Sequence, residues 1–324
     1  MFTASQLLEK VNSYISELNF SRSPYGLYAP VEYVLSIGGK RVRPVLMLMA
    51  YNLYKEDVDS ILPQAAAIET YHNYTLLHDD LMDKAEMRRN KPTVHRKWND
   101  NTAILSGDAM LVLAYRLMLD SHCTCLKKVL ELFSRTALEI CEGQQFDMEF
   151  ETRPDVAEQE YVEMIRLKTA VLLAASLKTG ALLGGASGKD AQLLYDSGIQ
   201  MGLAFQLKDD LLDVYGDPEV FGKNIGGDIL CNKKTYLLIK SLQIGNKAQK
   251  TALEYWLSCP NFAPEEKIYA VRKIYDEVGI KLICEERMNE HFEKAKSFLA
   301  EVNLPMEKKK RIGDYAEELM YRNM

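Results

Sequence analysis

The sequence lacks the segments that usually separate domains, because it contains no linker rich in proline, glycine or serine and no low-complexity stretch. Its 324 residues would allow two domains at about 150 residues each, but the missing linker favours one domain over residues 1–324. Cysteine is also scarce. Six cysteines in a chain of this length do not form a disulfide framework, and no second pair accompanies Cys123 and Cys125 at a zinc-binding spacing. We therefore expect reduced thiols in a cytoplasmic protein.

Signals for secretion, membrane insertion and nucleic-acid binding are missing as well. Residues 1–20 carry Glu9, Lys10 and Glu17 and have no apolar core of the kind that a secretory peptide needs. The most apolar region, residues 170–188, is interrupted by Lys178 and indicates a buried helix better than a membrane span. A net charge of −6 gives no electrostatic footprint for nucleic acid. We expect no membrane span and no nucleic-acid partner.

Alternating strand patterns with Asn-Gly or Asp-Gly turns are absent. Apolar residues instead recur at steps of three and four, as in Leu7, Val11, Ile15 and Leu18, with Ser5 available to cap this first helix. Pro44 and Pro63 are each expected to open a helix. The predicted helices cover residues 3–18, 45–54, 63–76, 109–119, 125–147, 158–183, 191–215, 234–242, 248–257, 265–278 and 280–300, with a last helix beyond Pro305. The pattern predicts an all-α fold, a single large helical bundle.

Two aspartate clusters share one spacing. Asp79, Asp80 and Asp83 follow one helical run, and Asp209, Asp210 and Asp213 follow another. Carboxylates four residues apart lie about 40° apart on one helix face and repel each other. A cation bound between them would reverse the sign of that interaction. A single cluster of this kind is usually a solvated acidic face.

A basic loop accompanies each cluster, which a solvated face does not explain. Residues 38–44 combine two glycines with Lys40, Arg41 and Arg43 ahead of a helix, a setting that suits a phosphate although it lacks the P-loop spacing. Residues 84–92 form a second basic loop after the first cluster, and residues 221–228 with Lys233 and Lys234 follow the second cluster. Carboxylates favour Mg²⁺, which binds a few of them together with substrate phosphates. The pattern predicts two diphosphates on hydrophobic chains.

Glu69 and His72 form an E-x-x-H pair, which is half of a di-iron carboxylate site. The other half is missing, because no other histidine has a glutamate three positions before it. A di-iron centre is therefore not expected.

The chain resembles the trans-prenyltransferases (polyprenyl diphosphate synthases) of the short-chain farnesyl and geranylgeranyl type. The motifs that carry the resemblance occur in the family's order over residues 36 to about 240: residues 38–44, His72 with 77–83, 88–95, Gly143-Gln144, Lys168-Thr169, 205–213, Gly222-Lys223, Asp228 and Lys233. Two departures stand out. Asn90 replaces the usual glycine after the paired arginines, and Cys231-Asn232 replaces the common acidic-Gly pair before Lys233.

The resemblance implies an isoprenoid-synthase bundle with a central apolar cavity, a homodimer, and several Mg²⁺ ions with Mn²⁺ as an alternative. It implies metal ligands at Asp79, Asp80, Asp83, Asp209, Asp210 and Asp213. It implies allylic diphosphate ligands at Arg88, Lys168, Thr169, Gln206, Lys223 and Lys233, of which Lys168, Thr169 and Gln206 would also act in catalysis. It implies isopentenyl diphosphate ligands at Gly39, Lys40, Arg43, His72 and Arg89.

The implied reaction is a Mg²⁺-assisted ionisation of an allylic diphosphate of C5–C15, followed by attack of isopentenyl diphosphate. Tyr74 and Thr75 are the fifth and fourth residues before Asp79, and an aromatic residue there resembles the short-chain pattern, which implies a C15–C20 all-trans product. An ordinary core aromatic would have the same spacing. Two alternative functions stay open, an all-α terpene cyclase and a non-catalytic partner subunit of a synthase heteromer.

Overall fold

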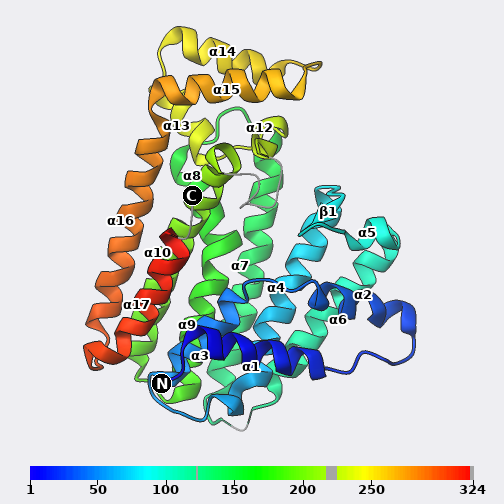
Figure 1. The fold of residues 1–324 in the computed structure, drawn as a ribbon, viewed down its shortest axis with the longest axis vertical. Coiled ribbons are helices and arrows are strands. Elements are labelled where there is room, and N and C mark those ends of the chain that lie inside the picture. Colours follow the sequence, from blue (N-terminus) through cyan, green and yellow to red (C-terminus); the bar gives the residue numbers. More distant parts are fainter. Residues whose placement is uncertain (122, 217–224, 322–324) are drawn as a thin grey trace. The chain divides into compact units, whose positions relative to one another are not determined.

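The structure is a computed structural model that describes residues 1–121, 123–216 and 225–321. It is built almost entirely of helices (Figure 1), so the predicted all-α class is confirmed. Two compact units emerge from the contacts. Unit 1 comprises residues 1–134, 175–195 and 301–313, and unit 2 comprises residues 135–174, 196–300 and 314–324. A single domain over residues 1–324 stays a prediction, and the two units are described separately.

Unit 1 is organised around one long helix, α4. It contains α1 (Ala4–Glu17), α2 (Tyr25–Ser36), α3 (Val42–Asn52), η1 (Val58–Ile61), α4 (Leu62–Met82), β1 (Met87–Arg88), β2 (Lys91–Pro92), α5 (Val94–Lys97), α6 (Asp100–Leu119) and the start of α7 (Leu126–Thr152). Helix α4 packs along α6 and also contacts α1 and α3. Residues 65–68, which are Ala-Ala-Ala-Ile, are fully buried, and the small side chains of the three alanines let the neighbouring helices approach.

Close approach of helices in unit 1 depends on glycine. A Cβ atom on Gly107 of α6 would overlap the imidazole of His78 on α4, whose Nε2 lies 3.3 Å from the Ile104 carbonyl oxygen. A Cβ on Gly180 would likewise overlap the Met47 carbonyl of α3. Any side chain at these positions would push the helices apart.

Unit 2 contains the second aspartate cluster. Its elements are the rest of α7, α8 (Glu158–Ile165), the π-helical turn η2 (Arg166–Ala170), α9 (Val171–Gly184) up to residue 174, α10 (Gly188–Tyr215) from residue 196, α12 (Gly227–Leu230), α13 (Tyr236–Ile244), α14 (Lys247–Ser258), α15 (Pro264–Val278), α16 (Ile280–Glu301) up to residue 300 and the end of α17 (Met306–Tyr321). Gly198 and Gly202 of α10 face Ala174 and Ala170, and a Cβ at either glycine would lie 2.5 Å from the opposite Cα. Helix α10 therefore packs tightly against this part of the chain.

Most predicted helices are present, with shifted ends. Helix α3 begins at Val42, so that Pro44 is its third residue. Helix α1 is capped by Thr3, which forms a capping box with Gln6, and not by Ser5 as expected. Helix α6 begins at Asp100 behind the cap Asn99, nine residues before the predicted start at residue 109. Helix α2 was missed, because its internal Pro30 hides the periodicity. The short hairpin of β1 and β2 was also missed.

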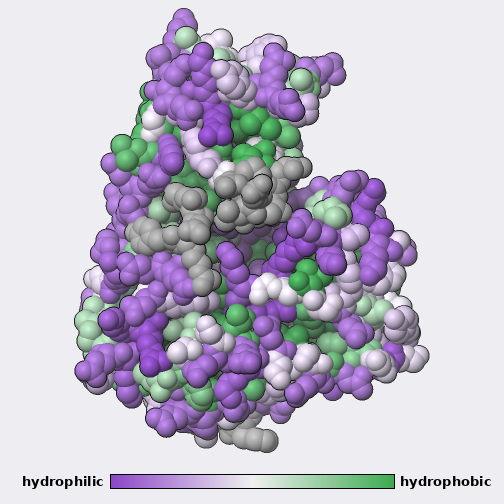
Figure 2. Space-filling model, viewed as in Figure 1, coloured by the Kyte–Doolittle hydropathy of each residue, from purple (hydrophilic) through white to green (hydrophobic). Residues whose placement is uncertain are grey.

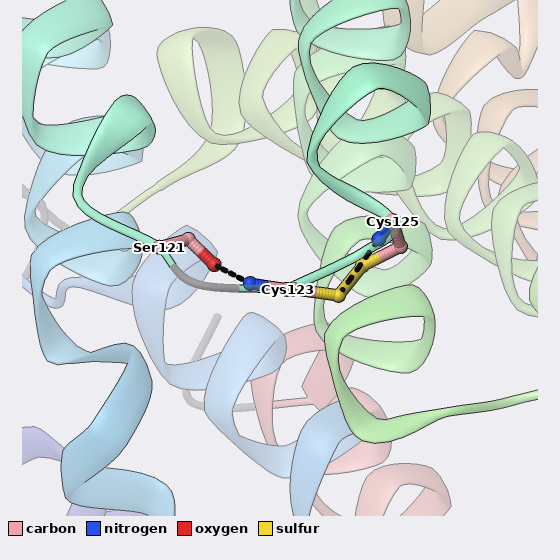
Figure 3. Close-up of a disulfide and its surroundings, with 3 residues drawn as sticks. All are labelled: Ser121, Cys123 and Cys125. Atoms are coloured by element: carbon pink, nitrogen blue, oxygen red, sulfur yellow. Dashed lines mark hydrogen bonds between the residues drawn. A yellow bond between two sulfur atoms is a disulfide. The ribbon is translucent and has the colours of Figure 1, made fainter.

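The thiol prediction is wrong for two cysteines. Cys123 and Cys125 are joined by a disulfide in the connection between α6 and α7, where the Cys123 N–H also donates to Ser121 Oγ at 3.3 Å (Figure 3). The other four cysteines are free thiols, and of these Cys141 and Cys231 are exposed. The disulfide closes a ring within one connection and does not link two helices.

Among the described residues, two helical stretches have the length and composition of membrane spans, although no span was expected from the sequence; length and composition alone do not distinguish a span from a buried core helix. Residues 158–184 are 78% buried within the protein over the most apolar window, as in the core of a helical fold. Helix α6 is only 33% buried over its window. On the face drawn in Figure 2, hydrophilic residues cover most of the surface and hydrophobic residues show only in small groups.

Candidate active site

Arg41 anchors the glycine-rich loop before α3. Arg41 is only 5% exposed and caps α3 with a left-handed backbone (φ 46°). Its guanidinium donates to Glu69 Oε1 at 2.6 Å and to the Leu35 carbonyl at 2.6 Å, and the Asn73 amide donates to the same Glu69 oxygen at 2.8 Å. Glu69 of the E-x-x-H pair therefore holds this loop against α4. Buried ion pairs persist only when their remaining hydrogen-bonding groups are also satisfied, as they are here.

The other half of that pair, His72, contacts Arg43. Arg43 Nη1 lies 3.2 Å from His72 Nε2, and because a guanidinium only donates, Nε2 accepts. Burial lowers the pKa of His72 well below its usual value, and the positive charge of Arg43 lowers it further. His72 is thus neutral at pH 7, and it orients Arg43.

Three of the residues expected to bind isopentenyl diphosphate lie at the surface of unit 1. Arg89 packs its guanidinium against the loop and donates to the Gly38 carbonyl. Gly39 makes this possible, since a Cβ there would lie 2.5 Å from Arg89 Nη1. Lys40 follows on the exposed side of the loop. The structure therefore brings Gly39 and Arg89 together, and Arg43 and His72 together.

The first aspartate cluster ends α4, and its three carboxylates differ in environment. Asp80 is 5% exposed, and Arg88 Nε lies 2.8 Å from both of its oxygens. Burial raises the pKa of Asp80, and the hydrogen bond from Arg88 opposes that shift. Arg88 Nη2 also lies 3.5 Å from Asp79 Oδ2, while Asp83 is exposed at the C-terminal end of the helix. Arg88 thus relieves the repulsion inside the cluster.

Tyr74 lies in a row of aromatic side chains along α4. Its ring centroid is 4.9 Å from that of His78 and 5.4 Å from that of Tyr71. Tyr71 in turn contacts Phe133 edge to face at 5.2 Å. Thr75 turns its hydroxyl back to the His72 carbonyl at 2.8 Å. The aromatic row continues away from Asp79, one helical turn after another.

The second aspartate cluster lines a cavity of about 210 Å³ within unit 2. The lining residues are Asp147, Tyr161, Met164, Gln206, Asp209, Asp210, Asp213, Asp228, Lys233, Lys234 and Thr235. Carboxylates and ammonium groups therefore share one concave surface. Such a surface suits an anionic ligand that brings a cation with it.

Asp210 differs from its neighbours because it is buried. It accepts hydrogen bonds from the Tyr161 hydroxyl, from the Tyr236 N–H at 3.3 Å and from Gln206 Nε2 at 3.2 Å. Burial, together with the charge of Asp228, raises the pKa of Asp210 to about 7 in spite of these bonds. Asp210 therefore orients Gln206, and its donors occupy both of its oxygens.

The π-helical turn η2 presents Lys168 and Thr169, and π-turns often occur at functional sites. Lys168 Nζ lies 2.6 Å from Asp147 Oδ2, and Lys233 Nζ lies 3.8 Å from the same atom. The Thr169 hydroxyl donates to Gln206 Oε1 at 3.0 Å. A Cβ on Gly143 would overlap the Lys168 backbone nitrogen, so the glycine of the Gly143-Gln144 motif lets α7 approach this turn.

Asp147 and Tyr161 are among the residues of this cavity that sequence reasoning missed. Asp147 follows Gln144 by one helical turn, and that spacing after a Gly-Gln pair could have singled it out. Tyr161 has no signal in the sequence, because its role depends on burial against Asp210. Lys223 and Gly222 lie outside the described residues.

A ready-made metal cage is absent from the part of the chain that the structure describes, since no three histidine, cysteine, aspartate or glutamate side chains there form one. The acidic cavity of unit 2 nevertheless fits Mg²⁺. This ion usually keeps its water molecules and binds one or two carboxylates together with substrate phosphates.

Comparison with known proteins gives a consistent result. The family model described as "Polyprenyl synthetase" matches residues 25–277. Geranylgeranyl diphosphate synthase from Methanosarcina mazei is 42% identical over 239 residues, which cover 73% of this chain and 74% of the relative. Geranylgeranyl pyrophosphate synthase from Geoglobus acetivorans is 39% identical and covers 89% of both chains.

Solved structures agree with these relatives. A crystal structure of a geranylgeranyl pyrophosphate synthase superposes with a TM-score of 0.95 at 43% identity and covers 100% of both chains. A polyprenyl synthase from Caulobacter crescentus, solved as a complex with calcium and isoprenyl diphosphate, has a TM-score of 0.89 at 29% identity and covers 99% of this chain and 96% of that one.

These relatives are transferases that make short-chain prenyl diphosphates, and the predicted enzyme class is confirmed with them. The helical fold, the order of the motifs and the two aspartate clusters with their cations agree with that class. The chain belongs to the polyprenyl synthetase family.

Proposed function

We propose that this protein condenses isopentenyl diphosphate with an allylic diphosphate of C5–C15 and forms an all-trans product of C15–C20. The observation that carries the proposal is the unit 2 cavity, where aspartates and Lys233 line one concave surface beside the Thr169–Gln206 pair. Carboxylates without cations would favour a plain metal site, and cations without carboxylates would favour a plain anion site. Their combination suits a diphosphate that arrives with Mg²⁺.

Isopentenyl diphosphate is assigned to the loop of unit 1. Arg43, Arg89 and Lys40 supply positive charge, the Gly39 backbone leaves room for a phosphate oxygen, and neutral His72 orients Arg43. The buried Arg41–Glu69 pair supports this assignment, because it fixes the loop while leaving the other cations at the surface.

The metal ions are assigned to the carboxylates of both clusters. Asp79 and Asp83 of unit 1 and Asp209 and Asp213 of unit 2 are the proposed Mg²⁺ ligands, with Mn²⁺ as an alternative ion. Asp80 and Asp210 are proposed as orienting residues, since Arg88 holds the first and Tyr161 with Gln206 holds the second. When bound, Mg²⁺ supplies the charge that stabilises departing diphosphate.

Side chains are proposed to bind the allylic diphosphate and to stabilise the charges that form during the reaction. Arg88, Lys168, Lys233 and Lys223 are proposed to bind the allylic diphosphate and to stabilise its negative charge as the C–O bond breaks. The Thr169 hydroxyl and Gln206 carbonyl oxygens are proposed to face the allylic cation, because Asp210 fixes the orientation of Gln206. The double bond of isopentenyl diphosphate attacks the cation, and the departed diphosphate accepts the proton that is then lost. Water must be excluded, since it would quench the cation.

Product length is assigned to the aromatic row under Asp79. Tyr74 contacts His78 on one side and Tyr71 on the other, and Tyr71 contacts Phe133. Packed aromatic rings resist displacement, because protein interiors are close to crystal density. The row therefore supports a tunnel of limited depth and a product of C15–C20.

A second copy of the chain is the proposed partner in a cytoplasmic homodimer. Leu105, Val112 and Leu119 of α6 recur every seven residues, and their side chains are 60%, 60% and 50% exposed. This spacing places them on one face, as in helix pairs that pack together. Asp108 and Arg116 are also exposed on α6, which supports a protein partner better than a lipid one.

Product formation should require both substrates and a divalent ion. Purified protein with Mg²⁺, isopentenyl diphosphate and dimethylallyl, geranyl or farnesyl diphosphate should give prenyl diphosphates, read by mass, and EDTA should abolish them. A hydrocarbon or alcohol formed from the allylic diphosphate alone would indicate a terpene cyclase. No product with any starter would indicate a non-catalytic subunit.

Replacing Lys168 with methionine should lower kcat/KM for the allylic diphosphate about 100-fold, because one group that stabilises the leaving diphosphate is lost. Lys127→Met is the matched control, since that side chain is 88% exposed on α7, and it should be neutral. Equal kinetics for the two variants, with both folded by circular dichroism, would remove Lys168 from the proposed mechanism.

Tyr74→Ala should lengthen the product by one or more C5 units, because the ring that limits the tunnel is removed. Chromatography of the dephosphorylated alcohols measures the length. Tyr269→Ala serves as the control, since Tyr269 is 72% exposed on α15. An unchanged product distribution would make Tyr74 an ordinary core aromatic.

Val112→Lys should convert a dimer to a monomer in light scattering, because it places a charge in the centre of the α6 face. Leu282→Lys is a matched change at a 62% exposed leucine of α16 and should leave the dimer intact. A wild-type monomer that floats with lipid vesicles would instead assign the α6 face to a membrane.

A further inference from the structure

The turn that precedes Lys233 has a geometry that usually requires glycine. The Asn232 N–H donates to the Ile229 carbonyl at 3.3 Å, and the Lys233 N–H donates to the Asp228 carbonyl at 2.9 Å. These two bonds form the Schellman motif that ends a helix, here α12. Asn232 occupies its left-handed position with φ 57°, where glycine is the commonest residue.

The side chain of Asn232 is held at both ends. Lys267 Nζ of α15 donates to Asn232 Oδ1 at 2.6 Å, and Asn232 Nδ2 donates to the Leu257 carbonyl of α14 at 3.1 Å. An ammonium group only donates and a carbonyl only accepts, so the orientation of the amide follows from its partners. Asn232 is thereby fixed between two helices.

Lys267 is a buried cation whose contacts are few. Its side chain is among the largest that are fully buried, at 1% exposed. Besides Asn232, its ammonium group contacts the Leu230 carbonyl at 3.5 Å and the Phe262 ring at 4.2 Å. Burial of a charge is costly unless it is hydrogen-bonded, so Lys267 and the turn of residues 230–232 stabilise each other. The two residues whose oxygen atoms it reaches, Leu230 at the end of α12 and Asn232 in the turn, come just before Lys233 in the chain.

The turn determines where the next residues lie. Lys233 follows Asn232 directly, and its Nζ lies 3.8 Å from Asp147 Oδ2 in the cavity of unit 2. The Thr235 N–H donates back to the Lys233 carbonyl at 2.9 Å. A change in the Asn232 backbone would therefore redirect both Lys233 and the start of α13.

We propose that Lys267 is a positioning residue, which holds Asn232 in the left-handed conformation and thereby directs Lys233 into the unit 2 cavity. Asn232, held by Lys267, stands where members of the polyprenyl synthetase family commonly have a glycine before the lysine that corresponds to Lys233. The ligand concerned is the allylic diphosphate, so the inference rests on the proposed function.

Four proteins test the proposal: wild type, Lys267→Met, Asn232→Gly and the double variant. Lys267→Met should raise KM for the allylic diphosphate about tenfold, with KM for isopentenyl diphosphate unchanged, because contacting residues couple by amounts of that order. In the Asn232→Gly background the same change should raise KM less than about threefold, since glycine adopts positive φ unaided and leaves no unpaired amide. Lys273→Met, on the exposed side of α15, is the matched control and should match wild type.

Hydrogen exchange read by mass spectrometry gives a measure that does not depend on turnover. Amides of residues 228–235 should exchange faster in Lys267→Met than in wild type, and the double variant should resemble Asn232→Gly. Unchanged exchange in that segment, an unchanged allylic KM, or effects of the two substitutions that simply multiply would overturn the proposal.

Two other outcomes can be told apart from those above: a Lys267→Met variant that does not fold, and a wild-type protein that is inactive. If Lys267→Met does not fold, a folded double variant with nearly wild-type KM supports the proposal, and an unfolded double variant contradicts it, because Lys267 would then serve packing alone. If wild type forms no product from any starter, the proposed function fails. The exchange data then decide alone whether Lys267 holds the turn.

Discussion

Mutual repulsion between closely spaced carboxylates is the constraint on which both aspartate clusters depend. In each cluster, one aspartate is held by neighbouring hydrogen-bond donors, which reduces the repulsion. Asp80 is held by Arg88, and Asp210 is surrounded by donors from Tyr161, Gln206 and the Tyr236 backbone. Since burial raises the pKa of Asp210 to about 7, part of its charge is also removed at neutral pH. The two clusters share a sequence pattern but use different physical means, an ion pair in one and hydrogen-bonded burial in the other.

Two loops of the site involve two kinds of cation: those proposed to bind a diphosphate, and buried ones that fix the loop backbone. Arg41 and Glu69 are almost fully buried, yet they lie next to the more accessible Lys40 and Arg43. Lys267 stands in the same relation to Lys233. In both loops a buried cation fixes the backbone, while a more accessible cation of the loop points to the cavity or the surface. Such pairs give a rigid site without requiring the binding groups themselves to be rigid.

The sequence predicted the helical class well, because that class depends on local spacing, and the site motifs are visible in the sequence for the same reason. The i and i+4 aspartates and the glycines at 38 and 39 carry their meaning within a few residues. What it missed depends on distant contacts. Neither the burial of Asp210 against Tyr161 nor the pairing of Arg41 with Glu69 is visible in local patterns. Helix α2 escaped notice because Pro30 lies within it. The disulfide was missed because cysteine counting alone says nothing about two residues brought together by one turn.

The disulfide between Cys123 and Cys125 contributes little to the stability of the fold. It links residues only two positions apart, within the connection between α6 and α7. In the chain-entropy model, the stabilisation by a crosslink grows with the length of the loop that it closes, and here that loop is minimal. The helices are held instead by buried side chains and by close contacts at glycine. The crosslink therefore adds little to the stability of the fold, and a reducing environment would leave its architecture intact.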